Sequence, residues 1–360
     1  MLNFLSPKIS SFGLDLSDHS IKIASLKKHG RNFYLSAFGR QEIPKGLIDN
    51  GEIKKEEELI GVIKEALRQV KGEKLNTKYC VVSLPETFSF VQVVKMPLMN
   101  QEELAEAMKW ELEARVPMSK DEIYYDWQII NSDANAPKDH LDVLLGVLPK
   151  KTVDPYLAVL KKAGLKPLIF EVEPVATTRA LIKNSCCDEP LIIVDLGDKR
   201  TSLFIFYGQA IYFTTELPVY NSLLVETLSQ KLGIDQDRAL QIKMKVGLNM
   251  KHPKSKVYQE LRVPLLDMAA KIKNYIDFYN EHIMLPFGQG KNIKKVLLCG
   301  GGAMMSGLPE FLFQELKIPV EPGNPWINIY DDPTNEIPTF PHKDSLSFTT
   351  ALGLALRNYD

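Results

Sequence analysis

One segment of this chain recurs half a chain length later, and this repeat constrains the fold more than any other feature. Phe12–Pro44 and Ile192–Pro218 each read as an apolar strand that ends in Asp-Leu-Ser/Gly-Asp, followed by two further strands joined by a glycine-containing turn. Asp15 aligns with Asp195. Repeats this far apart indicate two duplicated lobes rather than a solenoid of short units. The alternative is a chance similarity between two hairpins, because an apolar strand followed by a polar turn is common.

The length of 360 residues supports at least two lobes, since single cores rarely grow beyond roughly 250 residues. Helical sequence follows each meander. Lys54–Val70 carries its apolar residues on one face and ends before Gly72, and Asn221–Lys231 repeats this arrangement less cleanly. The recurring unit is therefore a meander of strands followed by a helix.

The region between the two copies has its own pattern of strands and helices. Asn100 and Glu103 form a capping box that opens a helix, and Thr152 is expected to cap a second one. Strands are expected at Phe90–Val94, Tyr124–Ile130 and Leu141–Leu148, with Asn131–His140 as a loop. These elements predict a compact α+β subdomain inserted into the first lobe.

The expected boundaries follow from these segments. The first lobe comprises residues 1–86 and 167–189, the inserted subdomain residues 87–166, the second lobe residues 190–240 and 295–360, and a helical subdomain residues 241–294.

Composition excludes several classes of protein. With 44 basic and 45 acidic residues the net charge is −1, so there is no general electrostatic reason to bind nucleic acid or a membrane. Apolar runs such as Leu191–Leu196 fall far short of the roughly 20 residues that span a bilayer. Met1–Ser6 does not resemble a secretory signal, and Leu354–Asp360 lacks an amphipathic anchor. The four cysteines show no C-x-x-C spacing. We therefore expect a cytoplasmic protein with reduced thiols and no direct membrane insertion.

Three turns are candidates for binding phosphate or nucleotide: Asp15–Ser20, Asp195–Thr201 and Gly300–Gly302. Converging backbone N–H groups in a tight turn supply partial positive charge to a phosphate. Aspartates at the same strand ends suit Mg²⁺ held through water. Each aspartate turn is also compatible with a plain hairpin, because Asp, Ser and His all favour turns. Three consecutive glycines after an apolar strand are costly unless backbone must approach another group closely.

Motifs of other chemistries are not found. The sequence contains no G-x-x-x-x-G-K-[ST] loop and no G-x-G-x-x-G fingerprint. Its six histidines show no metal-ligand spacing, and His19 reads as a turn residue rather than a base. No Ser/His/Asp or Cys/His arrangement presents itself.

These residues together resemble a known superfamily. The two aspartate-bearing meanders and the GGGAMMSGL segment are similar to the phosphate and adenosine motifs of the actin-like ATPases. Within them, the stretches Val94–Ile130, Leu144–Leu181 and Ser347–Arg357 resemble the PilM-like family of type IV pilus assembly. The resemblance implies an α/β, actin-like (ribonuclease-H-like) duplicated two-lobe fold with an inserted α+β subdomain in the first lobe.

The same resemblance implies ATP and Mg²⁺ in the cleft between the lobes. The implied cofactor-binding residues are Asp15, Ser17, Ser20 and Lys22 in the first phosphate turn, Asp195, Gly197 and Thr201 in the second, Lys243 near the nucleoside, and Gly300, Gly301 and Gly302 in the adenosine turn. Asp15 and Asp195 would hold Mg²⁺ through water, and Glu173 is the candidate for a catalytic role.

Three departures from the family pattern predict at most weak ATPase activity. Asp18 replaces a small residue and would place a carboxylate where phosphate oxygens approach, which opposes binding. Tyr220-Asn221 stands where two glycines usually precede a helix, and Leu240 replaces an acidic residue expected near Lys243.

The family also implies a partner and a place. PilM-like proteins bind the short N-terminal cytoplasmic peptide of a PilN-like inner-membrane protein, in a groove beside the inserted subdomain. The chain is thus expected to be an adaptor that is peripheral at the inner face of the inner membrane through that partner, among other pilus assembly components. The alternatives are an FtsA-like filament former, a sugar kinase, and the cytoplasmic actin-like component of a type II secretion system.

Overall fold

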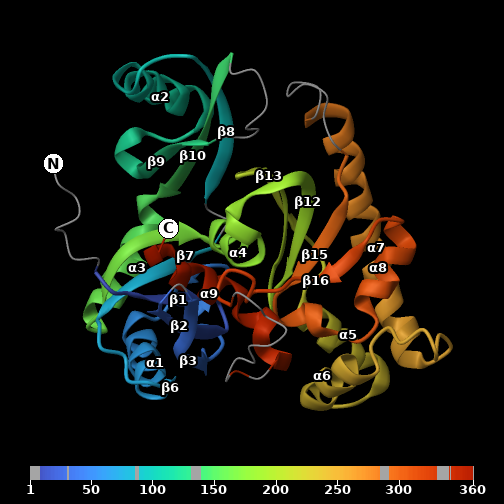
Figure 1. Ribbon diagram of the computed structural model, residues 1–360. Helices are drawn as coiled ribbons and strands as arrows, with labels where there is room; N and C mark the ends of the chain where they lie inside the picture. Colours follow the sequence, from blue (N-terminus) through green and yellow to red (C-terminus); the bar gives the residue numbers. More distant parts are fainter. Residues whose placement is uncertain are drawn as a thin grey trace. The chain divides into compact units, whose positions relative to one another are not determined.

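The computed structural model describes residues 9–30, 32–85, 89–130, 139–283, 292–330, 340 and 342–359. The chain divides into two compact units. Their helices and strands are labelled in Figure 1. The first comprises Met1–Ser185, Pro325–Thr339 and Phe348–Asp360, and the second comprises Cys186–Asn324 and Phe340–Ser347.

The first unit is built on a six-stranded sheet with the order β11-β7-β1-β2-β3-β6. Its strands are β1 (Phe12–Leu16), β2 (Ser20–His29), β3 (Asn32–Glu42), β6 (Lys71–Gly72), β7 (Tyr79–Leu84) and β11 (Lys166–Val172). The first three form the predicted antiparallel meander, while β7 runs parallel to β1 and β11 runs parallel to β7. A small hairpin of β4 (Ile48–Asp49) and β5 (Glu52–Ile53) follows the meander.

Helices cover both faces of β1, every residue of which is buried. Phe12, Leu14 and Leu16 share one core with α1 (Glu56–Arg68) and α3 (Lys150–Lys162). Gly13 faces the opposite side, where a Cβ would lie 2.2 Å from the carbonyl oxygen of Ala351 in α9 (Thr349–Leu356). The aspartate at the end of β1 therefore sits on a strand that packing fixes from two sides.

Helix α9 belongs to the first unit, whereas we expected residues 295–360 in the second lobe. It packs on α4 (Glu173–Leu181) so closely that a Cβ on Gly353 would lie 1.8 Å from the carbonyl oxygen of Ala176. All eight residues of α9 are buried. A helix that is apolar on every side carries no periodicity that identifies its neighbour, so its place in the first unit could not be predicted from local pattern.

The inserted subdomain has a separate core. It is a three-stranded antiparallel sheet with the order β8-β10-β9, formed by β8 (Phe90–Pro97), β9 (Ile123–Ile130) and β10 (His140–Pro149). Helix α2 (Gln101–Arg115) buries Leu104, Met108 and Leu112 against Val94 and Val143 of this sheet. The predicted capping box is confirmed, since Asn100 accepts from the N–H groups of Glu102 and Glu103. The predicted loop at 131–140 lies mostly outside the described residues.

The subdomain is smaller than the predicted span of 87–166, because α3 does not join its core. Val153, Tyr156 and Leu160 of α3 pack with the six-stranded sheet instead. The helix also begins earlier than predicted, at Lys150 after Pro149, so Thr152 is a buried residue inside it and not its cap.

The second unit repeats the strand arrangement of the first. Its five-stranded sheet has the order β14-β13-β12-β15-β16, made of β12 (Cys187–Leu196), β13 (Thr201–Gly208), β14 (Ala210–Leu217), β15 (Lys295–Cys299) and β16 (Val320–Pro322). An antiparallel meander is again followed by two parallel neighbours on its other side. The predicted duplication is confirmed at the level of strand order, which a chance likeness between two hairpins would not produce.

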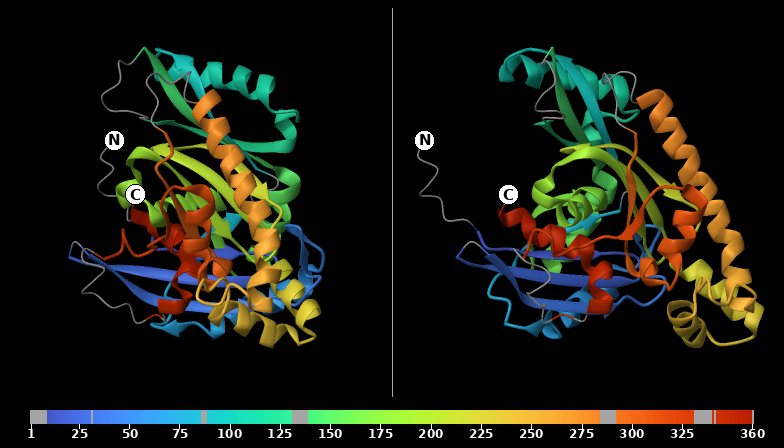
Figure 2. Two further views of the ribbon diagram at one scale, coloured as in Figure 1. Left: turned by 90° about the vertical axis from the view of Figure 1, so that its right-hand side faces the viewer. Right: turned by 45° about the vertical axis from the view of Figure 1, so that its right-hand side comes forward.

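The α-helices in the described part of this unit are α5 (Asn221–Leu232), α6 (Gln236–Lys245), α7 (Lys256–Phe278) and α8 (Leu308–Leu316). Leu228, Leu265 and Leu312 from three of them lie in one core with Val194 of β12. Helix α7 is the long orange helix in Figure 2. No helix within the described ranges is both long and apolar enough to cross a membrane.

Candidate functional site

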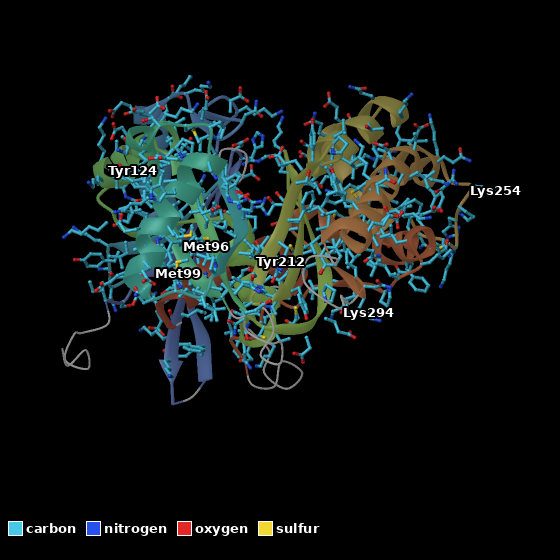
Figure 3. The ribbon with its side chains drawn as sticks, turned by 90° about the horizontal axis from the view of Figure 1, so that it is seen from above. Met96, Met99, Tyr124, Tyr212, Lys254 and Lys294 are labelled. Atoms are coloured by element: carbon cyan, nitrogen blue, oxygen red, sulfur yellow. The ribbon has the colours of Figure 1, made fainter. Side chains whose placement is uncertain are left out.

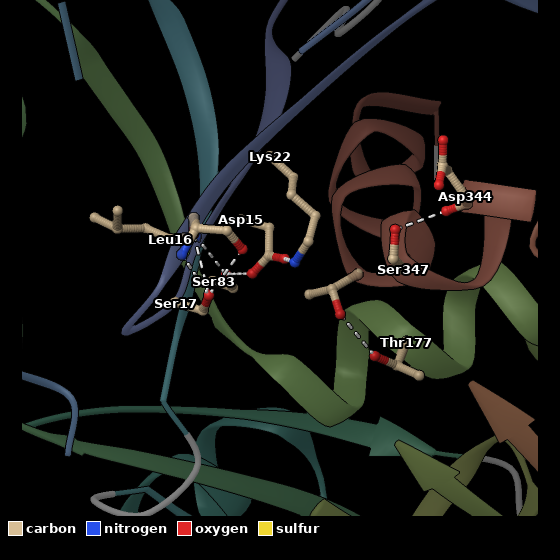
Figure 4. A network of polar contacts seen from close by, with 10 residues as sticks. Asp15, Leu16, Ser17, Lys22, Ser83, Thr177, Asp344 and Ser347 are labelled. Atoms are coloured by element: carbon tan, nitrogen blue, oxygen red, sulfur yellow. Dashed lines mark hydrogen bonds and ion pairs between the residues drawn. The ribbon is translucent and has the colours of Figure 1, made fainter. Parts of the chain in front are cut away.

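The first aspartate turn joins β1 to β2. Asp15 pairs with Lys22 across these strands and is only 4% exposed. Lys22 donates to Asp15 Oδ2 through an Nζ that lies 2.8 Å away, and the Ser83 hydroxyl donates to Oδ1 at 2.9 Å (Figure 4). The structure thus brings two of the predicted residues into direct contact.

Ser83 was not predicted from the sequence, although it holds one of the candidate residues in place. It lies on β7, next to β1 in the sheet, and its hydroxyl also accepts from the Leu16 N–H at 3.4 Å. A serine in an apolar strand gives no local signal of this role. Only the parallel pairing of two strands far apart in the sequence places it beside Asp15.

Ser17 and Ser20 close the turn itself. The Ser17 N–H donates to the Ser20 carbonyl oxygen at 3.0 Å, and the Ser20 N–H donates to the Ser17 hydroxyl at 3.3 Å. These bonds are those of a tight hairpin, so two of the predicted phosphate-binding residues stabilise the turn through each other.

Asp18 makes a contact that the sequence did not reveal. The residue is 6% exposed, and its carboxylate accepts from the N–H of Gly51, at 3.0 Å, in the β4–β5 hairpin. Asn50 and Gly51 both have positive φ, as two-residue hairpin turns require. Tyr156 of α3 donates to the Gly51 carbonyl oxygen at 2.9 Å. The carboxylate therefore has a backbone partner inside the protein. The predicted repulsion of phosphate stays a prediction.

The second aspartate turn joins β12 to β13. Asp195 ends a buried strand and pairs with Cys299 of the parallel strand β15. Burial together with the neighbouring Asp195 carboxylate raises the pKa of the Cys299 thiol well above its usual value. The buried hydroxyl of Thr201 donates to the Val219 carbonyl oxygen at 2.5 Å. A Cβ on Gly197 would lie 2.7 Å from the Arg200 carbonyl oxygen, so the tightness of the turn itself requires glycine there.

The three glycines after β15 differ in how closely other atoms surround them. Gly300 has φ +83°, and a Cβ there would lie 2.3 Å from Asp195 Oδ1. A Cβ on Gly302 would meet the Leu196 side chain at 2.6 Å. Gly301 is exposed, and its nearest neighbour would be Ser347 Cβ at 3.8 Å. Two of the glycines are thus explained by close packing on the aspartate turn, whereas a Cβ on Gly301 would make only an ordinary van der Waals contact.

Lys243 is fully buried in the second unit. Its ammonium donates to Asn221 Oδ1, and the Asn221 amide donates to Asp198 Oδ1 at 2.9 Å. Burial lowers the pKa of Lys243 to about 8, an effect that the charge of Asp198 opposes. The predicted contact with a nucleoside stays a prediction. Leu240, on the same helix, is 41% exposed.

The candidate Glu173 is the first residue of α4 and is partly buried. Two residues earlier, Glu171 receives two hydrogen bonds from Arg179, at 2.7 and 2.9 Å. Arg179 also donates to the Gly353 carbonyl oxygen at 3.1 Å. This buried ion pair, which the sequence did not reveal, fixes the helix that carries Glu173 against α9.

A second candidate surface lies on the inserted subdomain, where β9 is an edge strand. Tyr124, Tyr125 and Ile129 of β9 are 39 to 45% exposed, and Figure 3 shows Tyr124 on this subdomain. The eight β9 residues pair with β10 without a register shift. The edge strand β11 of the larger sheet has a proline and a register shift near Pro167, features that discourage added strands. Strand β9 has no proline and no register shift, and its charged residue is the exposed Asp126, whose carboxylate accepts from the Trp127 N–H at 2.9 Å.

The duplicated sheets and their aspartate turns define an actin-like protein. Known proteins agree with this class, since the family model for the type IV pilus assembly protein PilM matches residues 13–359. The chain therefore belongs to the family of the type IV pilus assembly protein PilM.

Solved structures show the same fold. A PilM-PilN type IV pilus biogenesis complex matches with a TM-score of 0.81 and 23% identity, over 98% of this chain and 100% of that one. EutJ from Carboxydothermus hydrogenoformans matches with a TM-score of 0.55 and 16% identity, over 96% and 89% of the two chains. MreB5 of Spiroplasma citri, solved with ADP, matches with a TM-score of 0.52 and 14% identity, over 96% and 95%.

A partial sequence match is found with the cell division protein FtsA of Neisseria meningitidis serogroup B (strain ATCC BAA-335 / MC58). It is 24% identical over 182 residues, which are 46% of this chain and 44% of FtsA. The match thus spans less than half of that relative's length.

Proposed function

We propose that this protein is an adaptor that captures the N-terminal cytoplasmic segment of a PilN-like inner-membrane protein, and that it is held at the inner face of the membrane through that partner. The observation that carries the proposal is the family match over residues 13–359. The PilM-PilN complex, whose fold this chain shares, supports it.

The β9 edge, which has no proline and no register shift, supports a peptide-binding site on the inserted subdomain. An extended peptide can add to an exposed strand through backbone hydrogen bonds, while side chains on alternate positions give specificity. Tyr125 and Ile129 occupy alternate positions on one side of β9, and Tyr124 lies on the other side. Tyr124 is held by its hydroxyl, which donates to Asp154 at 3.0 Å, and by Lys150, whose ammonium lies 5.4 Å from the ring centroid.

The test is the affinity of the purified protein for a synthetic peptide of the PilN-like N-terminus from the same organism. We expect the double variant Tyr125→Glu/Ile129→Glu to weaken binding by at least about tenfold, since two apolar contacts are replaced by charge. Trp110→Glu is the matched control, because Trp110 on α2 is 72% exposed and lies on another element of the same subdomain. If the wild-type protein did not bind the peptide, the adaptor proposal would be refuted. If the double variant bound the peptide as tightly as the wild type, β9 would not be the binding site.

We also propose that the protein binds ATP with Mg²⁺ and hydrolyses it slowly if at all. Asp15 and Asp195 are strand-end carboxylates suited to water-mediated Mg²⁺, Lys22 is a cation beside Asp15, and Gly301 is exposed. Calorimetry with MgATP on the wild-type protein and on Asp195→Ala tests this. We expect heat of binding with the wild-type protein and none with Asp195→Ala. Equal heats from the two proteins would exclude Asp195 from the nucleotide site.

A further inference from the structure

A stretch of the second unit is free of acidic residues. Arg238–Gln259 contains no aspartate or glutamate, although the whole chain holds 45 of them against 44 basic residues. The segment links α6 to α7. Its exposed lysines are Lys245 at the end of α6, Lys251 and Lys254 in the loop, and Lys256 at the start of α7. We call these four lysines the basic tip.

The base of this loop is fixed to the body of the unit. The Leu248 N–H donates to the Ser306 carbonyl oxygen at 2.7 Å, and the Leu248 side chain is fully buried. A Cβ on Gly307 would lie 2.3 Å from the Leu248 carbonyl oxygen, so the two backbones are in close contact. Ser255 then caps α7 by accepting from the Tyr258 N–H at 3.2 Å. The loop between Leu248 and Ser255 is therefore held in place at both of its ends.

The tip itself is exposed and positively charged. Lys254 lies at an outer margin of the second unit (Figure 3). Among the residues that the structure describes, none forms an ion pair with the four lysines. Met250 is 38% exposed beside Lys251 and adds an apolar side chain to the patch. In a chain of net charge −1, this patch is a local concentration of positive charge.

We propose that the basic tip docks on an anionic lipid surface. Lysines near an anionic leaflet gain attraction from many headgroups at once and need no fixed geometry. That suits four side chains that form no ion pair with any residue in the described ranges, and an exposed methionine can enter the headgroup region. Specific nucleic-acid sites instead use bidentate arginine and stacked aromatic rings, and the tip has neither. This contact is additional to the proposed peptide capture and does not depend on it.

The experiment is co-sedimentation of the full chain with lipid vesicles. Phosphatidylcholine vesicles with about one third phosphatidylglycerol should bind the protein, and binding should fall between about 0.05 M and about 0.3 M salt because the charges are exposed. Vesicles of phosphatidylcholine alone should bind at least about tenfold less. The variant Lys251→Gln/Lys254→Gln/Lys256→Gln should lose at least about tenfold in partitioning.

The matched control is Lys45→Gln/Lys64→Gln/Lys74→Gln, which removes the same charge from three exposed lysines of the first unit. It should stay within about twofold of wild type, since its lysines lie on three separate segments of the sequence. Both triple variants should keep their affinity for the PilN-like peptide, which separates this proposal from the adaptor function. The lipid-docking proposal would be overturned by equal binding to both kinds of vesicle or by equal losses in the two variants. Tighter binding to a DNA duplex than to anionic vesicles would also overturn it, as would displacement from the vesicles by millimolar inorganic phosphate.

Discussion

The carboxylate of Asp18 accepts a hydrogen bond from the backbone N–H of Gly51, across 3.0 Å. This bond joins the β1–β2 turn to the β4–β5 hairpin, and both groups lie inside the protein. The residue that most sets this turn apart from its family pattern thus has a structural partner. The Asp18 carboxylate satisfies a backbone donor, and this structural role accounts for its presence in the turn.

Replacing Asp18 by alanine should lower the free energy of unfolding by about 2 kcal/mol, because a buried N–H loses a charged acceptor. Urea denaturation measures the change. Asp49→Ala is the control, since Asp49 lies exposed in the same hairpin and should cost no more than about 0.5 kcal/mol. Equal effects of the two substitutions would show that the Asp18–Gly51 bond contributes nothing.

Gly300→Ala should destabilise the protein by about 3 kcal/mol or more. Gly300 combines φ +83° with ψ 165°, a region almost exclusive to glycine, and a Cβ would lie 2.3 Å from Asp195 Oδ1. Gly301→Ala serves as comparison, because its Cβ would meet nothing closer than 3.8 Å. Thermal unfolding of both variants decides the matter, and a comparable fall in Tm for the two would contradict the packing argument.

Lys243 should make the free energy of unfolding depend on pH in the alkaline range. Burial lowers its pKa from 10.5 to about 8, so between these values the folded protein holds fewer protons than the unfolded chain. The free energy of unfolding therefore rises with pH over this range, by about 3 kcal/mol from this residue. Denaturation at a series of pH values should show that rise in the wild type and in Lys245→Met, whose lysine is exposed, but not in Lys243→Met. A parallel pH dependence of all three proteins would mean that Lys243 has an ordinary pKa.

Arg179→Met should cost about 3 to 5 kcal/mol, because it leaves the buried Glu171 without its bidentate partner. Arg357 also contacts Glu171, at 3.0 Å, but its side chain is 37% exposed. Arg357→Met should therefore cost no more than about 1 kcal/mol. Calorimetric unfolding compares the two, and the reverse order of cost would show that Arg357 is the main partner of Glu171.

Local patterns predicted those parts of the fold that neighbouring residues decide. The meanders ending at Asp15 and Asp195 and the capping box at Asn100 follow from alternation and turn chemistry, and the structure contains them. The boundary of the inserted subdomain was missed, because α3 is amphipathic in either setting and only its packing shows which sheet it covers.

The sequence by itself determined that the chain is duplicated, that each half carries an aspartate at the end of a buried strand, and that a subdomain is inserted between them. Tertiary structure alone decided what those side chains contact. Ser83 reaches Asp15, Gly51 binds Asp18, and Lys243 is buried under Asn221 because strands and hairpins distant in sequence meet there. Hydrogen bonds and close packing act between atoms a few ångströms apart. Local sequence patterns do not identify which distant residue will come that close.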